Sequence, residues 1–284
     1  MNTYLDCYPC FLRQALSAAR RAGADFEQQH AVLRWTLTHL HTLPLTTTPP
    51  VMAAAIHAQV RALTGVDDPY QTAKQEATAQ ALARYPTLLA HLDAASDPLE
   101  CAVRLAIAGN IIDLGVAEQF DLDATLERVL IQPFAIDALD ALRQRLDSVE
   151  QVLYLADNAG ETVFDRPLLD LLRRRGLAVT YVVKAAPIIN DATRADALAA
   201  GIADGIEIID NGSAAPGTLL EQCSAAFRER FAAAPLIVAK GQANYETLSA
   251  LSAPIFFLLQ AKCQVIAGDL HVPPGAIVLK GAVL

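Results

Sequence analysis

The stretch Val152-Leu-Tyr-Leu-Ala-Asp-Asn-Ala-Gly-Glu-Thr162 decides the fold. Its first five residues are apolar and rich in strand formers, and an Asp-Asn pair, a glycine and a helix-opening Glu-Thr follow at once. This pattern predicts a buried parallel strand, a tight turn and a helix. Asp157 and Asn158 would then lie at the carboxyl end of a strand, where open α/β sheets place their ligands. Their oxygens, beside the positive end of a helix, suit a hard cation together with an anion.

The residues after this stretch alternate between strand and helix patterns. Strands are predicted at residues 152–156, 178–183, 206–209, 236–239, 255–259 and 276–279, and helices at 162–175, 192–200 and 219–231. Repeated units of this length predict a parallel sheet that is covered by helices on both faces.

The residues before this stretch predict only helices. The first is rich in Ala and Leu and ends at Gly23, and a proline, Pro86, is expected to break the fourth. The others are predicted at residues 26–41, 51–63, 70–85, 98–108, 116–130 and 136–146. We therefore expect a change of domain near residue 147, with a helical subdomain over residues 1–147 and the α/β core over residues 148–284.

Length and composition narrow the function classes. A chain of 284 residues with 53% hydrophobic and 19% charged residues can bury a large core and has no reason to be disordered over long regions. Its net charge of −9 argues against a general binder of nucleic acid or anionic membranes, but leaves a phosphorylated small molecule open. The sequence lacks a run of roughly 18 apolar residues and a signal-peptide pattern at its start, so a cytoplasmic location is expected.

Cys7 and Cys10 form a single CxxC motif. Two thiols supply half of a structural zinc site or a redox pair, yet no His stands at ligand spacing and no thioredoxin-like strand precedes the motif. The odd total of five cysteines, with Cys101, Cys223 and Cys263 scattered singly, is not a disulfide framework. Metal binding, redox chemistry and simple packing all remain open for this motif.

Polar residues follow several of the predicted strands. Asn190 and Asp191 come after the second strand, Lys240 after the fourth, and Gln260 and Lys262 after the fifth. In a parallel sheet these turns share one edge, so side chains far apart in sequence are expected to converge there.

The converging residues suit a metal ion and a phosphate. Asp157, Asn158 and Asp191 would give three oxygen ligands to Mg²⁺ or Mn²⁺. Lys240 and Lys262 would supply positive charge for phosphate oxygens, and the turn from Gly241 through Gln242 to Asn244 would offer backbone N–H groups. This set predicts metal-assisted phosphoryl transfer to water.

The same residues also suit purely structural roles. Asp191 precedes a predicted helix and is a good N-cap, Asn158 and Gly160 could simply form a turn, and Glu161 could complement a helix dipole. Asn110 and Asp113, in the segment Gly109-Asn-Ile-Ile-Asp113, lie about one helical turn apart and could either cap a helix or face the cleft between the domains.

Motifs for competing activities are missing. The sequence has no G-x-G-x-x-G after a strand and no G-x-x-x-x-G-K-[ST], which disfavours dinucleotide and P-loop nucleotide binding. It has no G-x-S-x-G nucleophile elbow. The second Asp that aspartyl phosphatases need two residues after the first is replaced by Ala159.

Five motifs in order resemble the damage-control phosphatase family, a metal-dependent family first catalogued as a domain of unknown function. They are the CxxC, Gly109-Asn-Ile-Ile-Asp113, Asp157-Asn-Ala-Gly-Glu161, Pro187-Ile-Ile-Asn-Asp-Ala-Thr193 and Lys240-Gly-Gln-Ala-Asn-Tyr-Glu246. The resemblance covers nearly the whole chain, and the CxxC points to the smaller prokaryotic members.

The resemblance implies a Rossmann-like three-layer α/β/α core beside a helical N-terminal subdomain. It implies that Asp157, Asn158 and Asp191 hold a divalent metal such as Mn²⁺, Mg²⁺, Co²⁺ or Ni²⁺. It also implies a phosphate-binding loop at residues 240–246, with Lys262 as a further phosphate contact. The implied substrates are small phosphorylated metabolites such as sugar phosphates or phosphopantetheine derivatives, with a role in metabolite damage control.

The sequence departs from the family pattern at two places. Ala243 stands where the turn is expected to have Gly, and an Ala at positive φ would cost on the order of 1 kcal/mol. Lys184-Ala-Ala stands before Pro187, where Arg and Gly are expected, so the substrate pocket is expected to differ.

The combined hypothesis is a cytoplasmic metal-dependent phosphatase with Asp157, Asp191 and Lys240 as catalytic residues. Asp157 would be either the nucleophile or only a ligand while water attacks. The expected substrate contacts are Asn110, Asp113, Glu161, Gly241, Gln242, Asn244 and Lys262. Two rivals stay open, namely a non-catalytic sensor of phosphometabolites or metal and a thiol-redox module that uses the CxxC.

Overall fold

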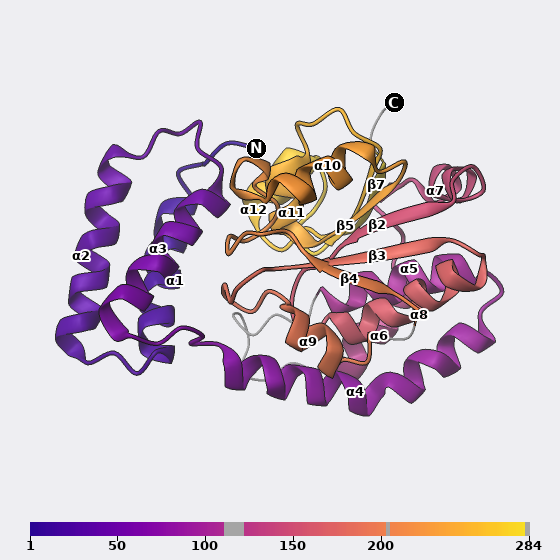
Figure 1. Ribbon diagram of the computed structural model, residues 1–284, viewed down its shortest axis with the longest axis horizontal. Helices are drawn as coiled ribbons and strands as arrows, with labels where there is room; N and C mark the ends of the chain where they lie inside the picture. Colours follow the sequence, from indigo (N-terminus) through magenta and orange to yellow (C-terminus); the bar gives the residue numbers. More distant parts are fainter. Residues whose placement is uncertain (111–121, 203–204, 282–284) are drawn as a thin grey trace.

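The computed structural model describes residues 1–110, 122–202 and 205–281 (Figure 1). The helices are α1 Cys7–Arg21, α2 Phe26–Thr42, α3 Pro49–Thr64, α4 Gln71–Ala94, α5 Pro98–Gly109, α6 Leu122–Ile131, α7 Leu139–Leu146, α8 Thr162–Arg174, α9 Arg194–Ala199, the 3-10 turn η1 Leu220–Gln222, α10 Ala225–Ala233, α11 Gly241–Leu248 and α12 Gln264–Leu270. The strands are β1 Ile136–Asp137, β2 Gln151–Leu155, β3 Ala178–Val183, β4 Glu207–Asp210, β5 Ile237–Lys240, β6 Ile255–Gln260 and β7 Ile277–Gly281.

The strands form one sheet in the order β1-β7-β6-β5-β2-β3-β4. All neighbouring strands are parallel except β6 and β7, which pair antiparallel. The chain builds outward from β2 to β3 and β4, and then returns to place β5 on the other side of β2. The strand order therefore reverses between β2 and β5, which is where open α/β sheets form a ligand crevice at the carboxyl ends of their strands.

Each face of the sheet has its own apolar core, because side chains alternate along every strand. Val152 and Tyr154 of β2 pack in a core with helices α4 to α9, whereas Leu153 and Leu155 pack in a core with α10, α11 and α12. The structure is therefore a three-layer α/β/α fold with a mostly parallel sheet, and this fold class is confirmed. In Figure 1 the long helix α4 runs beneath α8 and α9, and it contacts both.

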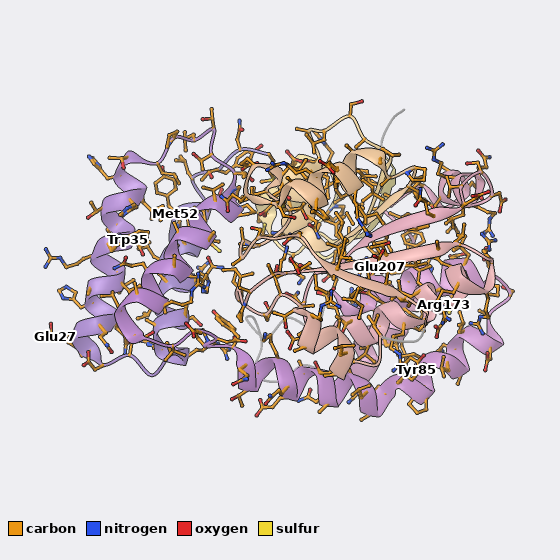
Figure 2. The ribbon with its side chains drawn as sticks, in the orientation of Figure 1. Glu27, Trp35, Met52, Tyr85, Arg173 and Glu207 are labelled. Carbon is orange, nitrogen blue, oxygen red and sulfur yellow. The ribbon has the colours of Figure 1, made fainter. Side chains whose placement is uncertain are left out.

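Helices α1, α2 and α3 form a separate apolar cluster beside the sheet (Figure 1). Met52 is buried in this cluster and Trp35 packs partly against it (Figure 2). The domain boundary near residue 147 stays a prediction. None of the described helices is long and apolar enough to cross a membrane.

The prediction that Pro86 ends a helix is wrong, because α4 continues to Ala94. A proline in a helix interior removes one backbone hydrogen bond and costs about 3 kcal/mol. Beyond it, Leu88 and Leu92 are buried in the core that α4 shares with α5 and α8. Burying a leucine side chain contributes about 1.5–3 kcal/mol, so these two residues offset the cost.

Two further helix predictions need correction. The residues predicted as one helix over 136–146 start instead as strand β1, which pairs with β7, and Asp137 Oδ1 then accepts a hydrogen bond from Leu139 N (2.9 Å) where α7 begins. The helix predicted over 219–231 is interrupted, because Ser224 Oγ accepts a hydrogen bond from Phe227 N (3.2 Å) and starts α10 as its N-cap. The helix predicted over 116–130 falls partly on residues 111–121, outside the described residues, and α6 covers its second half.

Candidate active site

The candidate site lies beyond the carboxyl ends of β2 and β5, at the point where the strand order reverses. Asp157 and Asn158 follow β2, and Gly241 opens α11 directly after β5. The segment after β3 folds over the same point, because Asp191 forms an isolated bridge with Asn158 and Ala192 N donates to the carbonyl of Asp157 (2.8 Å). The structure thus brings the three predicted metal ligands together.

The backbone is strained beside this site. Ile189, two residues before Asp191, has a φ of 45°. Positive φ is costly for a β-branched residue, and it persists only where the surrounding structure imposes it. Such strain is concentrated at functional sites, which agrees with the position of this segment.

Asn110 links three parts of the fold at the site. It is fully buried, and its Nδ2 donates to Asp157 Oδ2 (2.9 Å) and to Glu161 Oε1 (3.0 Å). Its Oδ1 accepts a hydrogen bond from Gln260 N at the end of β6 (3.2 Å). The residue therefore fixes the end of α5 against the β2 turn and β6. Asp113, its predicted partner, lies outside the described residues.

Glu161 orients the amide of Asn158. Asn158 Nδ2 donates to Glu161 Oε1 at 2.6 Å. Because an ionised carboxylate only accepts hydrogen bonds, the NH₂ group of Asn158 must face Glu161. The carbonyl oxygen of the same amide then lies on the side away from Glu161. This oxygen is the atom of the amide that a hard cation binds.

Lys240 is fully buried and does not face the surface. Its Nζ donates to Asp165 Oδ1 (2.7 Å) and lies 3.3 Å from Glu161 Oε2. Burial lowers its pKa, but the charges of Asp165 and Glu161 raise it more, so the net pKa lies above its usual range and the group is an ammonium. The predicted catalytic lysine is thus held by two carboxylates, and its contact with a phosphate stays a prediction.

Two residues that sequence reasoning left out of the site belong to this buried cluster. Asp165 accepts hydrogen bonds from Lys240 and from two tyrosines, and Lys184 forms an ion pair with Asp191 Oδ2 (3.5 Å) and donates to the carbonyl of Gly217. Both carried a detectable signal. Asp165 stands four residues after Glu161 and thus on the same helix face, and Lys184 follows the last residue of β3.

The buried charges of the cluster do not balance. Among the described residues it contains four buried carboxylates, Asp157, Glu161, Asp165 and Asp191, but two buried ammonium groups, Lys184 and Lys240. Burial raises the pKa of Asp157 well above its usual range, and the charges of Glu161 and Asp191 raise it further. The charges of the half-buried Lys262 and of Lys240 act in the opposite direction and lower this pKa.

The donor set around Asp157 fits a divalent cation. Two carboxylates and an amide oxygen are hard ligands, and an excess of buried negative charge is what a dication neutralises. Gly241 keeps the space open, because a Cβ there would overlap Asp157 Oδ2 and lie 3.0 Å from Asn110 Nδ2. Within the described ranges no group of three His, Cys, Asp or Glu side chains is arranged to hold a metal by itself. The predicted ligand set combines two carboxylates with the oxygen of Asn158.

The predicted phosphate-binding turn is the first turn of α11. Asn244 is buried, donates to the carbonyls of Lys240 (2.8 Å) and Ala156 (3.2 Å), and accepts from Thr218 Oγ1 (2.8 Å), so it ties the site loops together. Gln242 Nε2 donates to Glu246 Oε1 (3.1 Å). Ala243 has no positive φ, so the expected strain from replacing glycine there does not arise.

The CxxC lies near the site but apart from the carboxylate cluster. Cys7 is half-buried and Cys10 exposed at the start of α1, and Cys263 accepts a hydrogen bond from Gln242 Nε2 (3.6 Å). Burial raises the pKa of the Cys7 thiol, and the charges of Glu246, Cys10 and Cys263 raise it further. Cys101 and Cys223 are buried in the two cores on either face of the sheet.

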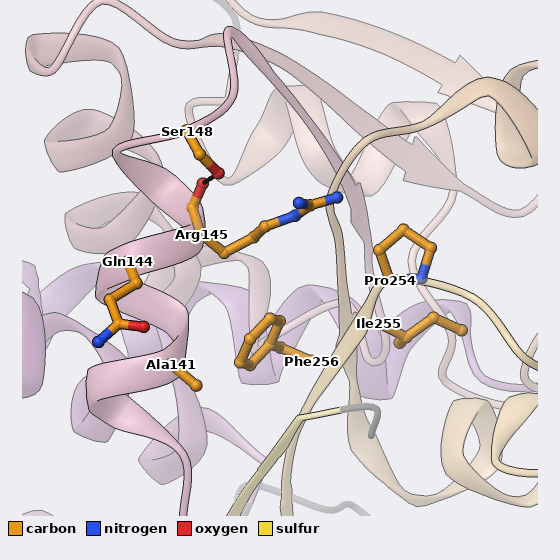
Figure 3. Close-up of a pocket in the computed structure, with 7 residues that line it drawn as sticks. All are labelled: Ala141, Gln144, Arg145, Ser148, Pro254, Ile255 and Phe256. Atoms are coloured by element: carbon orange, nitrogen blue, oxygen red, sulfur yellow. Dashed lines mark hydrogen bonds between the residues drawn. The ribbon is translucent and has the colours of Figure 1, made fainter. Parts of the chain in front are cut away.

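A surface cavity of about 310 Å³ lies at the opposite end of the sheet (Figure 3). It is bounded by Pro254 and Ile255, where β6 begins, and its one lysine or arginine side chain, Arg145, donates from Nε and Nη2 to the carbonyl of Pro235 (3.1 and 2.7 Å). None of the described residues that line it is acidic. It therefore lacks the chemistry that the strand ends bring together.

Both the sequence and the fold of this chain are similar to those of known proteins. Residues 3–278 match the model of the damage-control phosphatase ARMT1-like domain. A damage-control phosphatase of Pyrococcus horikoshii is 34% identical over 284 residues, which cover 98% of this chain and 97% of that one. A damage-control phosphatase of Archaeoglobus fulgidus is 38% identical over 237 residues, 81% of each chain. The crystal structure of a DUF89 family protein from Pyrococcus horikoshii superposes with a TM-score of 0.90 at 32% identity over 99% of each chain.

Proposed function

Because the chain belongs to the damage-control phosphatase ARMT1-like domain family, we propose that it is a metal-dependent phosphatase that hydrolyses a small phosphorylated metabolite in metabolite damage control. Sugar phosphates and phosphopantetheine-like compounds are the proposed substrates. The cation would be Mn²⁺, Mg²⁺, Co²⁺ or Ni²⁺.

One observation supports the metal above all others. Among the described residues, four buried carboxylates and two buried ammonium groups meet beside the amide of Asn158, whose NH₂ group donates to Glu161. An unbalanced buried carboxylate costs several kcal/mol, and such groups normally pair or bind a metal. A dication at Asp157, Asn158 and Asp191 would compensate the two excess charges.

The residues of this chain would divide the work as follows. Asp157, Asn158 and Asp191 would hold the cation, which when bound supplies Lewis-acid polarisation of the phosphoryl group. Lys262 and the backbone N–H groups at the start of α11 would bind phosphoryl oxygens and stabilise the charge that develops on them. Lys240 would act indirectly, through the carboxylates of Glu161 and Asp165 that its ammonium group contacts.

The test is phosphate release from an aryl phosphate and a panel of sugar phosphates, with each of the four metals or with EDTA. We expect metal-dependent release that Asp157→Ala abolishes. Asp210→Ala is the matched control, because Asp210 also ends a strand of the sheet but is exposed, and it should keep the activity. No release by folded protein that binds the metal would contradict the phosphatase and favour a sensor.

A further inference from the structure

A chain of hydrogen bonds connects the centre of the sheet to the candidate metal ligands. Tyr154 of β2 and Tyr181 of β3 each donate a hydroxyl hydrogen bond of 2.8 Å to Asp165, one to each carboxylate oxygen. Lys240 donates to the same carboxylate and contacts Glu161. Glu161 in turn accepts from the amide of Asn158.

This arrangement is closed to solvent. Tyr154, Tyr181, Asp165, Lys240 and Glu161 are all fully buried. The two tyrosine rings stack with their centroids 5.4 Å apart, which fixes both hydroxyls relative to Asp165. Burial and the charge of Asp165 raise the pKa of both tyrosines well above the usual range, so both hydroxyls remain hydrogen-bond donors.

Stability alone does not account for such a cluster. Burying a carboxylate and an ammonium costs several kcal/mol per ion, and apolar residues of the same volume are often as stable or more stable. The tyrosines and Asp165 lie too deep to contact a substrate. What the cluster does achieve is a single geometry for Lys240, since its ammonium is held by Asp165 on one side and Glu161 on the other.

We propose that Asp165, clamped by Tyr154 and Tyr181, is a positioning residue that sets the direction of the Asn158 amide oxygen at the metal site. Asp165 fixes Lys240, Lys240 fixes Glu161, and Glu161 holds the NH₂ of Asn158 so that its oxygen faces the cation. This inference rests on the metal site of the proposed function. It assigns a role to three residues outside the ligand set.

The test measures Mn²⁺ binding directly, by titrating the protein with Mn²⁺ and following free Mn²⁺ by electron paramagnetic resonance. Tyr154→Phe and Tyr181→Phe each remove one hydroxyl and change no charge. We expect each to weaken Mn²⁺ binding about 10-fold and the pair together up to about 100-fold, the usual range for residues that orient metal ligands. At saturating Mn²⁺, the kcat for phosphate release should return to the wild-type value.

Tyr85→Phe is the matched control. Tyr85 is half-buried on α4, burial and the Asp170 carboxylate contribute to raising its pKa, and Arg166 stacks 3.7 Å above its ring (Figure 2). The Tyr85→Phe variant also loses a tyrosine hydroxyl near an aspartate, but this hydroxyl is not part of the chain of hydrogen bonds. Its Mn²⁺ affinity should equal that of the wild type.

The outcomes separate the possible causes. Asp165→Asn removes a charge as well as an acceptor, so a loss of affinity in that variant without any loss in the tyrosine variants would show a purely electrostatic effect and overturn the proposal. Equal Mn²⁺ affinity in all variants would do the same. A wild type that binds no Mn²⁺, Mg²⁺, Co²⁺ or Ni²⁺ would instead overturn the metal site itself. Thermal unfolding in EDTA confirms that each variant is folded before its affinity is compared.

Discussion

The backbone of Gly241 lies directly against the carboxylate of Asp157, so that a Cβ at position 241 would overlap Asp157 Oδ2. The φ of Gly241 is also positive, at 78°. Position 241 therefore requires glycine for two independent reasons, its positive φ and the lack of space for a Cβ. The second reason is a close contact between the start of α11 and Asp157, which follows β2.

Replacing Gly241 by alanine should abolish metal binding and phosphate release. The added methyl group would displace the Asp157 carboxylate or move the start of α11. Gly275→Ala is the matched control, because Gly275 has a φ of 82° but nothing lies within 4 Å of its missing Cβ. That variant should lose only about 1 kcal/mol of unfolding free energy and keep its activity. Mn²⁺ titration and phosphate release distinguish the two, and an active Gly241→Ala would contradict the close contact.

Asp157→Asn should remove the activity and yet stabilise the metal-free protein. The pKa of Asp157 is raised in the folded state by burial and by Glu161 and Asp191. A folded pKa above the unfolded value of about 4 means that the wild type loses stability as pH rises above that value. The Asp157→Asn variant has no carboxyl group at this position, so it does not lose this part of its stability as the pH rises.

In EDTA at pH 7 we expect the unfolding free energy of Asp157→Asn to exceed that of the wild type by on the order of 1 kcal/mol. Added Mn²⁺ should raise the melting temperature of the wild type only. A variant less stable than the metal-free wild type would show that Asp157 is already compensated without a cation.

His57 should make the protein less stable in mild acid. It is buried in α3, and its Nε2 has no hydrogen-bond partner among the described residues. Burial, with a smaller effect of Arg61, lowers its pKa to about 4. Because the unfolded chain takes up this proton near pH 6.5 and the folded chain does not, stability is complete above pH 6.5 and falls as pH drops toward 4, by about 3 kcal/mol.

Urea unfolding from pH 7 to pH 4.5 measures this effect. His57→Phe keeps a ring beside Tyr70, which lies 5.8 Å from the His57 ring, and it should flatten the part of the acid dependence that His57 causes. His91→Phe, on the partly exposed end of α4, should leave the dependence unchanged. A wild-type slope that persists in His57→Phe would assign the acid sensitivity to other groups.

Lys262→Ala should weaken substrate binding more than metal binding. Lys262 is half-buried, and its charge acts on Asp157 from the loop after β6. Losing a hydrogen bond from an ammonium to a phosphate costs about 1.5–3 kcal/mol, so the KM for a sugar phosphate should rise about 10-fold or more. Lys280→Ala on β7 serves as the control. An unchanged KM would remove Lys262 from the phosphate site.

The double variant Cys7→Ser and Cys10→Ser should retain phosphate release within about two-fold, because neither thiol contacts the carboxylate cluster and the pKa of Cys7 is raised, away from the range of reactive thiolates. The measurement is metal-dependent phosphate release under reducing and oxidising conditions. Loss of all activity in this variant, together with activity retained in Asp157→Ala, would favour the thiol-redox rival.

Local patterns in the sequence predicted strands β2 to β7, but not β1, and the convergence of Asp157, Asn158 and Asp191, because a buried strand is a continuous apolar run and its end is marked by polar residues. They could not predict that α4 passes through Pro86, since the burial of Leu88 and Leu92 depends on contacts with α5 and α8. For the same reason, the sequence could not predict that the side chain of Lys240 is fully buried. A lysine after a strand suggests a solvated end, and only the position of α8 reveals that Asp165 encloses it.

The unbalanced carboxylates around Asp157 have a consequence for the cell. If the cation binds as proposed, it stabilises the native chain over the unfolded one in proportion to its free concentration. Chains made during a shortage of that ion would open more often and meet cellular proteases more often. The amount of this protein would then follow the supply of its own cofactor, without any dedicated regulator.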